Sequence, residues 1–232
     1  MIINRRINSV DIKICDSTQS LVELMSRIMT EELDKGLCIV PGGRTPVKIF
    51  SHLSSRKCIS SKSKLLLSDD RLVSIKSDKS NYKMLLDNLK ISFENSLPLS
   101  YYDKLLEVGE LGLEQEISQI LEENDLNCAF LGVGSDGHTA SLFPNKSLFE
   151  STQSAFKVMN NNDDFPRYTL SFKTIMKFKK IVFVISGIEK NFVLKELFSR
   201  ENNFDNYPFQ KLVMEHPNVL IVCDNAAGKD IG

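Results

Sequence analysis

Short apolar runs alternate along the chain with segments whose apolar residues recur at helical spacing. The apolar runs are almost continuous, which is typical of strands buried on both faces, and they occupy residues 37–40, 64–67, 128–133, 168–171, 181–186 and 219–223. Helices are predicted to begin at a capping box formed by Ser20 and Glu23 and near Pro46, and to span residues 80–90, 111–121 and 189–198. Because the two patterns alternate, we expect an α/β fold with a mostly parallel sheet and helices on both faces.

Three polar or glycine-containing segments follow predicted strands, at Gly42, Asp69 and Asp136. The second of them, residues 68–71, is predicted to be a loop. In a parallel sheet the carboxyl ends of the strands share one edge, where ligands bind. We therefore expect the three segments to converge on one cleft, within a single domain that spans residues 1–232.

The amino-acid composition limits the kinds of partner and compartment that we expect for the chain. The chain of 232 residues has 42% hydrophobic residues, 25% charged residues and a net charge of −1, so its overall field favours neither nucleic acid nor an acidic membrane. No apolar run is long enough to span a membrane, and none follows the two N-terminal arginines, so we expect a cytoplasmic protein. The five cysteines are widely spaced without a Cys-x-x-Cys pair, which argues against a metal site or a disulfide framework.

One glycine-rich turn carries the most informative residues, because residues 131–144 read LGVGSDGHTASLFP. Asp136 lies two residues before His138, and an imidazole with an ordinary pKa of about 6.5 suits general acid–base catalysis at cellular pH. The alternative is a tight turn with a helix-capping aspartate and a solvated histidine. The other two histidines, His52 and His216, have no partner pattern and are interpreted as structural or solvated.

A second glycine segment connects a predicted strand to a helix. Gly42 and Gly43 let the backbone approach a ligand, and Arg44 and Thr45 open a helix whose unpaired N–H groups suit a phosphate or an oxyanion. The segment lacks the Gly-Lys-Ser/Thr ending of a Walker loop. The alternative is a turn without a ligand.

Charged residues stand at the remaining strand ends. Asp69, Asp70 and Arg71 join two carboxylates to a guanidinium that suits phosphate, and the alternative, which the local sequence favours slightly, is a salt-bridged surface loop. Arg167 precedes a predicted strand, and the alternative to a ligand-binding role is a surface charge at the start of that strand. Lys190 falls in the first turn of a predicted helix, where it opposes the helix dipole, so a bound anion would explain its position.

Together these segments resemble the 6-phosphogluconolactonases, in a wider group that includes the glucosamine-6-phosphate deaminases. Residues 131–144 match the pattern G-x-G-x-D-G-H-T-A-S-L-F-P almost throughout, and residues 42–46 match the loop GGSTP. Further matches, in family order from about residue 37 to 228, are to D-E-R…S-N at 69–71 and 80–81, R-I-T-L-T at 167–171, G-x-x-K at 187–190 and D-x-A-A at 224–227.

The resemblance implies a NagB/RpiA/CoA-transferase-like fold, a modified Rossmann fold, that uses no metal or organic cofactor. It implies a carboxylic ester hydrolase, monomeric or homodimeric, that opens 6-phospho-D-glucono-1,5-lactone in the second step of the oxidative pentose phosphate pathway. His138 is then the general base, supported by Asp136, and Asp69 either supports the imidazole likewise or binds sugar hydroxyls. The residues expected to bind the substrate and its phosphate are Gly42, Gly43, Arg44, Thr45, Arg71, Arg167 and Lys190.

Two positions depart from the family pattern. Arg44 stands where the family has serine, which replaces a hydroxyl contact by a charged side chain. Asp70 stands where the family has glutamate, which shortens the carboxylate by one methylene. The resemblance therefore implies a charged contact with the phosphate at Arg44 and carries over no role for Asp70.

Two alternative functions remain at the level of the sequence. A glucosamine-6-phosphate deaminase/isomerase resembles A-F-N-E-P after the histidine, whereas residues 139–144 here contain no carboxylate, which favours the hydrolase. A non-catalytic sugar-phosphate sensor is the second alternative. It needs an output domain, which we do not expect here, and the presence of both Asp136 and His138 favours an enzyme.

Overall fold

Ten strands form two sheets in the computed structural model of the chain, which describes residues 1–7, 10–56, 59–60, 63–89, 99–144, 148–160, 164–198, 207–229 and 231. Cys58, and Lys90 at the predicted end of a helix, lie outside these ranges. Inside them the cysteines are buried free thiols, at Cys15, Cys38, Cys128 and Cys223.

The larger sheet has seven strands in the order β1-β2-β10-β9-β6-β3-β4. In chain order these are β1 (Ile2–Ile7), β2 (Val10–Cys15), β3 (Leu37–Val40), β4 (Lys64–Leu67), β6 (Leu126–Gly132), β9 (Lys180–Ile185) and β10 (Val219–Asp224). Only β1 and β2 pair antiparallel, and the other neighbouring strands are parallel. The central strands are buried along most of their length, as continuous apolar runs predict. The predicted, mostly parallel α/β sheet is confirmed.

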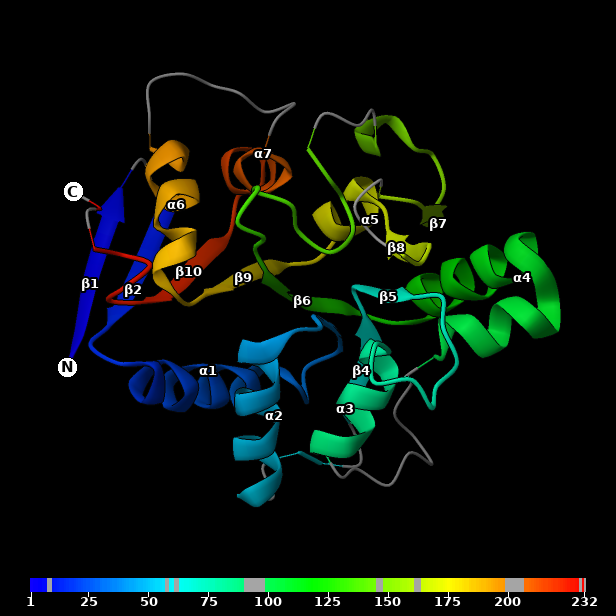
Figure 1. The fold of residues 1–232 in the computed structure, drawn as a ribbon, viewed down its shortest axis with the longest axis horizontal. Helices are drawn as coiled ribbons and strands as arrows, with labels where there is room; N and C mark the ends of the chain where they lie inside the picture. The colour runs from blue at the N-terminus through cyan, green and yellow to red at the C-terminus, as the bar shows by residue number, and fades with distance from the viewer. Residues whose placement is uncertain are drawn as a thin grey trace.

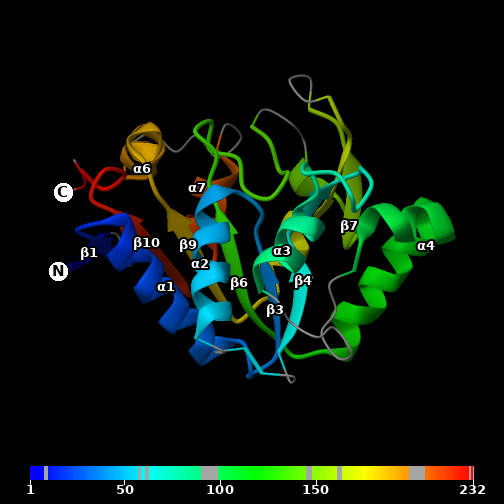
Figure 2. The same cartoon turned by 60° about the horizontal axis from the view of Figure 1, so that its bottom comes forward.

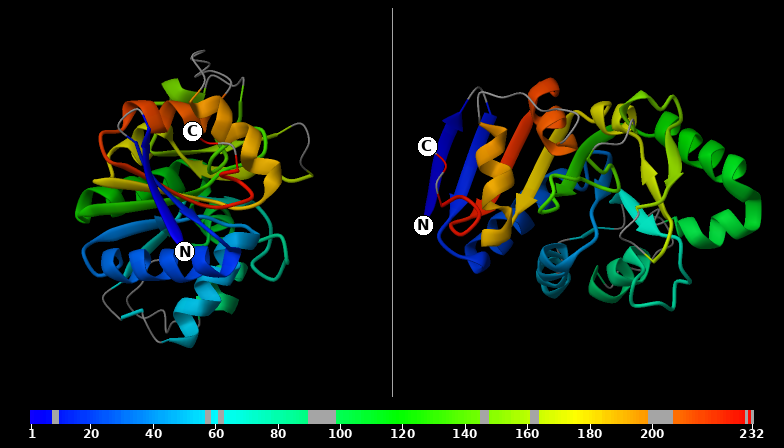
Figure 3. Two further views of the ribbon diagram at one scale, coloured as in Figure 1. Left: turned by 90° about the vertical axis from the view of Figure 1, so that its left-hand side faces the viewer. Right: turned by 45° about the horizontal axis from the view of Figure 1, so that its top comes forward.

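Helices cover both faces of this sheet (Figures 1 and 3). On one face lie α1 (Thr18–Glu32) and α2 (Arg44–Ser55), with α3 (Asn81–Leu89) beside α2, and on the other lie α6 (Asn191–Leu197) and α7 (Pro208–Glu215). At the end of the molecule opposite both termini, α4 (Tyr101–Glu123) bends at Gly109, where φ is +73° (Figure 2). No helix within the described ranges is long and apolar enough to cross a membrane.

The smaller sheet corrects the predicted loop at residues 68–71. It has the order β5-β8-β7, and its strands are β5 (Asp69–Arg71), β7 (Ala155–Val158) and β8 (Arg167–Leu170). β5 is a strand because its polar residues pair antiparallel with β8, Asp69 opposite Thr169. Residues 168–170, predicted as a strand, therefore belong to this antiparallel sheet, and Ser171 caps the short helix α5 (Phe172–Met176).

Several helix boundaries differ from the predicted ones for local reasons. Ser17, not Ser20, caps α1, because the Ser17 side chain accepts the N–H of Ser20 at 3.1 Å. Leu21, Leu24, Met25 and Ile28, which share one stripe of the helix, are nonetheless buried. α2 begins at Arg44 with Pro46 in its first turn, and α4 begins at Tyr101, ten residues before the predicted start at 111.

Candidate active site

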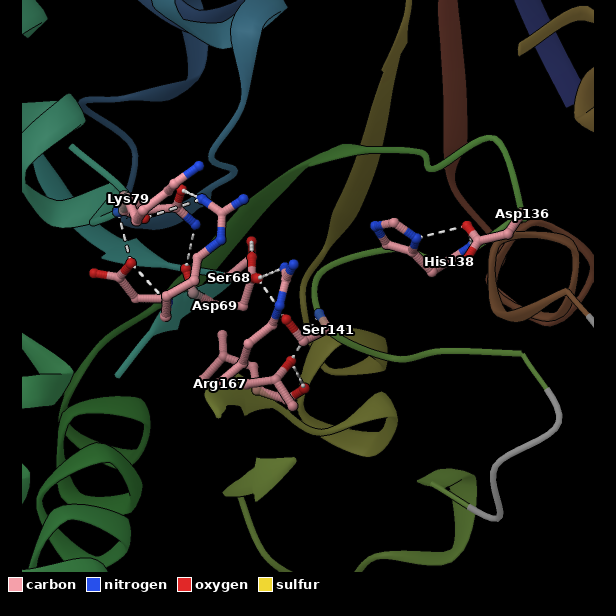
Figure 4. A network of polar contacts seen from close by, with 12 residues as sticks. Ser68, Asp69, Lys79, Asp136, His138, Ser141 and Arg167 are labelled. Carbon is pink, nitrogen blue, oxygen red and sulfur yellow. Dashed lines mark hydrogen bonds and ion pairs between the residues drawn. The ribbon is translucent and has the colours of Figure 1, made fainter. Parts of the chain in front are cut away.

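The carboxyl ends of β3, β4, β6 and β9 surround a pocket of about 240 Å³. Nine of the ten predicted site residues line it, namely Gly42, Gly43, Arg44, Thr45, Asp69, Arg71, His138, Arg167 and Lys190. The tenth, Asp136, is not among the lining residues, but its side chain lies beside that of His138 and contacts the ring (Figure 4). The three segments that follow strands therefore do meet at one cleft, to which the smaller sheet contributes Asp69, Arg71 and Arg167.

The turn after β6 joins Asp136 to His138. His138 Nδ1 lies 2.6 Å from Asp136 Oδ1, and the same oxygen accepts the His138 N–H at 3.2 Å. Gly134 lies against this pair, since a Cβ at that position would be 2.2 Å from His138 Nδ1 and 2.4 Å from Asp136 Oδ1. Gly137 has φ of +81°, which favours glycine. The glycines thus allow the turn to hold the imidazole against the carboxylate.

Electrostatics fix which ring nitrogen carries the proton. Burial raises the pKa of Asp136, but the hydrogen bonds and charge of His138 outweigh it and lower the pKa to about 2. The carboxylate is therefore ionised at cellular pH and assigns the proton of neutral His138 to Nδ1. In the part of the chain that the structure describes, Nε2 has no hydrogen-bond partner, so it is the acceptor available to a ligand.

Phe143 supports both His138 and Arg167. Its ring centroid lies 5.1 Å from that of His138, and the Arg167 guanidinium carbon lies 5.5 Å from it. Phe143 is buried, so it forms a fixed surface beneath the imidazole and the guanidinium. The segment after the histidine, which carries no carboxylate, thus contributes an aromatic platform.

Asp69 is buried beside this platform and does not reach His138. Its Oδ2 accepts the Ser141 hydroxyl at 2.6 Å and lies 3.7 Å from Arg167, while Oδ1 accepts the Ser68 hydroxyl at 3.0 Å (Figure 4). No hydrogen bond joins Asp69 to His138 among the residues that the structure places. The carboxylate instead ties β5 to the segment after the histidine and orients Arg167.

Asn81 is a pocket residue that the prediction of individual sites missed. Its Oδ1 accepts from Arg71 at 2.7 Å, and its Nδ2 donates to the Asp69 carbonyl at 3.0 Å. Gly42 packs on this amide, because a Cβ there would be 2.1 Å from Asn81 Oδ1. The signal was present in the S-N match at residues 80–81. Ser68, Ser186 and Glu189 also line the pocket and were not predicted.

Asp70 faces away from the pocket and caps α3. Its carboxylate accepts the backbone N–H groups of Arg71, Asn81 and Tyr82 at 2.6–3.0 Å and the Ser80 hydroxyl at 3.2 Å. Burial raises the pKa of Asp70 to about 6, against the lowering effect of the N–H groups. The Asp70 carboxylate, which is shorter than the glutamate of the family pattern, therefore caps the helix that carries Asn81.

We expect Asp70→Ala to lower the free energy of unfolding by at least about 2 kcal/mol, because buried N–H groups lose their acceptor. Urea unfolding at neutral pH measures the change. Asp87→Ala is the matched control, since Asp87 forms an exposed ion pair with Lys83 and its loss costs at most about 1 kcal/mol. Equal losses in the two variants would contradict the capping role.

A second group of cations lies at the start of α2 and beside α6. Burial lowers the pKa of Lys190; the charges of Glu189 and Asp136 oppose this shift, and Arg44 adds to it, so Lys190 lies within electrostatic reach of all three. α2 begins after Gly43, whose φ is +109°, without a side-chain cap and without an acidic residue in its first turn. Its first N–H groups therefore have no intrahelical partner and suit an anion.

The remaining histidines lie outside this pocket. His216 is buried, and its Nε2 lies 2.8 Å from the Phe178 carbonyl, which is a structural contact as predicted. His52 lines a separate surface groove with Met1 and Arg56. In the described residues no cluster of three or more His, Cys, Asp or Glu side chains has the arrangement of a metal site.

The comparisons with known proteins identify the family. Residues 14–221 match the family model described as glucosamine-6-phosphate isomerases/6-phosphogluconolactonase. The chain belongs to this family. A family member from Thermotoga maritima, named 6-phosphogluconolactonase, is 32% identical over 168 residues, which are 70% of this chain and 74% of that protein.

Solved structures of the family share the fold. The structure of 6-phosphogluconolactonase from Trypanosoma brucei superimposes with a TM-score of 0.79 at 20% identity, covering 95% of this chain and 98% of that one. A monomeric glucosamine-6-phosphate deaminase of the NagB superfamily superimposes almost as well, with a TM-score of 0.77 at 18% identity over 94% and 98% of the two chains. The fold predicted from the resemblance is confirmed, and it is common to both activities.

Proposed function

We propose that this chain is a 6-phosphogluconolactonase, which hydrolyses 6-phospho-D-glucono-1,5-lactone to 6-phospho-D-gluconate. The observation that carries the proposal is the His138–Asp136 pair at the edge of a pocket lined by four cationic side chains. The relative from Thermotoga maritima with that name supports it. Because the fold serves two activities, the choice rests on the site, where residues 139–144 offer no acid for a deaminase.

In this proposal His138 Nε2 acts as the general base. It accepts a proton from water while the water oxygen attacks the lactone carbonyl carbon, and Asp136 stabilises the imidazolium that forms. When the tetrahedral intermediate collapses, the bond between the carbonyl carbon and the ring oxygen breaks. His138 then returns the proton to that oxygen, which becomes a hydroxyl group, and the new carboxylic acid loses its proton to solvent.

The remaining groups bind and orient the substrate. The N–H groups at Gly42 and Gly43 are candidates for the oxyanion of the intermediate. Arg71 and Lys190, with Arg167, are candidates for the 6-phosphate, which would fix the carbonyl near His138.

We infer further that the chain is one domain, because both sheets supply residues to one pocket. Asp69 in this proposal positions Arg167 and the segment after the histidine, and its contact with sugar hydroxyls remains a prediction. Arg44 adds a cation beside Lys190 where the family has a hydroxyl. A monomeric or homodimeric state and a cytoplasmic location also remain predictions.

Turnover of freshly generated 6-phosphogluconolactone tests the proposal. We expect acid release well above spontaneous hydrolysis and no ammonia from glucosamine 6-phosphate in a parallel assay. Ammonia release without lactone hydrolysis would instead identify a deaminase. Tight binding of a sugar phosphate without any turnover would identify a sensor.

A further inference from the structure

Asp224 lies at the end of β10, buried behind the pocket and 5% exposed. Its Oδ2 accepts the Ser186 hydroxyl at 2.5 Å, both carboxylate oxygens lie 3.2 Å from the Gly187 N–H, and Oδ1 accepts the Ala227 N–H at 2.9 Å. The proposed mechanism does not use this carboxylate. Two of its hydrogen-bond donors, Ser186 and Gly187, begin the turn that carries Lys190.

The turn at residues 187–190 brings Lys190 to the pocket. Gly187 has φ of +104°, and a Cβ there would be 2.4 Å from the Glu189 carboxylate. A hydrogen bond of 3.1 Å from the Lys190 N–H to the Gly187 carbonyl closes this turn. Ser186 and Lys190 both line the pocket, so the carboxylate lies behind residues that face the ligand.

A second contact holds the far side of the same turn. Asn191, next to Lys190, is 9% exposed and donates from Nδ2 to the Ala227 carbonyl at 2.9 Å. Ala227 in turn donates its N–H to Asp224. The residues on both sides of the Lys190 turn are therefore attached to the segment after β10.

We propose that Asp224 is a positioning residue, which fixes the Ser186–Gly187 turn and thereby holds the Lys190 ammonium where the phosphate of the substrate binds. The inference rests on the proposed function, because it assigns the phosphate to Lys190. A lysine side chain is flexible, so the direction in which it leaves the backbone decides whether its charge reaches the phosphate. A buried carboxylate sets that direction well, since its hydrogen bonds are charge-assisted and short.

Two lactones that differ only in the phosphate test the proposal. Asp224→Asn keeps the size of the side chain but turns an amide N–H toward the N–H groups of Gly187 or Ala227. We expect the ratio of kcat/KM for 6-phosphogluconolactone to that for glucono-1,5-lactone to fall about tenfold, carried by KM. Combined with Lys190→Ala, the substitution should lower the ratio no further than Lys190→Ala alone.

Thr18→Val is the matched control, because the Thr18 hydroxyl contacts the same carboxylate at 3.5 Å from α1 and not from the turn. It should leave the ratio unchanged. Ser186→Ala, which keeps the carboxylate and removes one contact, should lower the ratio by a smaller factor and serves if Asp224→Asn does not fold. Equal loss on both lactones, or additive effects with Lys190→Ala, would overturn the positioning role.

The two proposals fail in distinguishable ways. A wild-type protein that hydrolyses neither lactone contradicts the proposed function. Calorimetry with 6-phosphogluconate and gluconate then tests the positioning role alone. Weaker binding of only the phosphorylated ligand by both Asp224→Asn and Lys190→Ala supports it, and unchanged binding by Asp224→Asn contradicts it.

Discussion

Replacing His138 by alanine is expected to slow the enzymatic hydrolysis of 6-phosphogluconolactone by about 10²- to 10⁴-fold, which is the usual contribution of positioned proton transfer. The loss should fall on kcat, because in the proposed mechanism Nε2 acts on the attacking water, whereas the cations proposed to bind phosphate are other residues of the pocket. The side chain is 29% exposed, so its removal leaves no large cavity in the core. Acid release corrected for spontaneous hydrolysis measures the effect.

His52→Ala is the control for this substitution, since His52 is also half-buried but lines a different groove. It should retain the wild-type rate. Both variants should melt near the wild-type temperature and bind 6-phosphogluconate. Wild-type turnover by His138→Ala would remove this residue from the mechanism.

The sequence predicts the larger sheet because its central strands are buried on both faces. Residues 37–40 and 219–223 are apolar without interruption, and this pattern leaves little choice of environment. β2 and β1 escaped the prediction because neither is a continuous apolar run: β2 reads VDIKIC, and β1 is an edge strand with polar residues at three of its six positions. Its sequence IINRRI is exposed at five of six positions.

The smaller sheet could not be predicted from local pattern. β5 consists of the polar residues Asp69, Asp70 and Arg71, and it is a strand only because β8 pairs with it from nearly a hundred residues away. The smaller sheet therefore depends on a long-range pairing that no residue within β5 signals. That pairing also brings Arg167 beside Asp69.

The same distinction holds in the candidate site. The contact between Asp136 and His138 was predictable, because two residues of one glycine turn cannot lie far apart. The contact of Asp69 with Ser141 spans 72 residues and depends on the packing of two sheets. Sequence reasoning therefore found the residues that line the pocket more readily than the contacts that orient them.

Replacing Asp136 by asparagine is expected to lower kcat by about 10²-fold or more, although the amide oxygen can still accept from Nδ1. The reason is charge, since the carboxylate stabilises the imidazolium that forms when His138 takes the proton. Because the pKa of Asp136 is about 2, its own titration gives no limb of the pH–rate profile near neutrality.

The free energy of unfolding should also depend on pH through the lowered pKa of Asp136. A carboxyl whose pKa is lowered on folding contributes stability above its unfolded pKa of about 3.9 and loses it as the pH falls. Wild type and Asp136→Asn should therefore differ at pH 7 and converge toward the folded pKa of about 2.

Asp125→Asn is the matched control, because it removes an aspartate of similar exposure, 56% against 52%, that pairs with Lys179 away from the pocket. It should leave kcat unchanged. A wild-type kcat in Asp136→Asn would mean that this carboxylate holds the ring in place without stabilising the charge that forms on it.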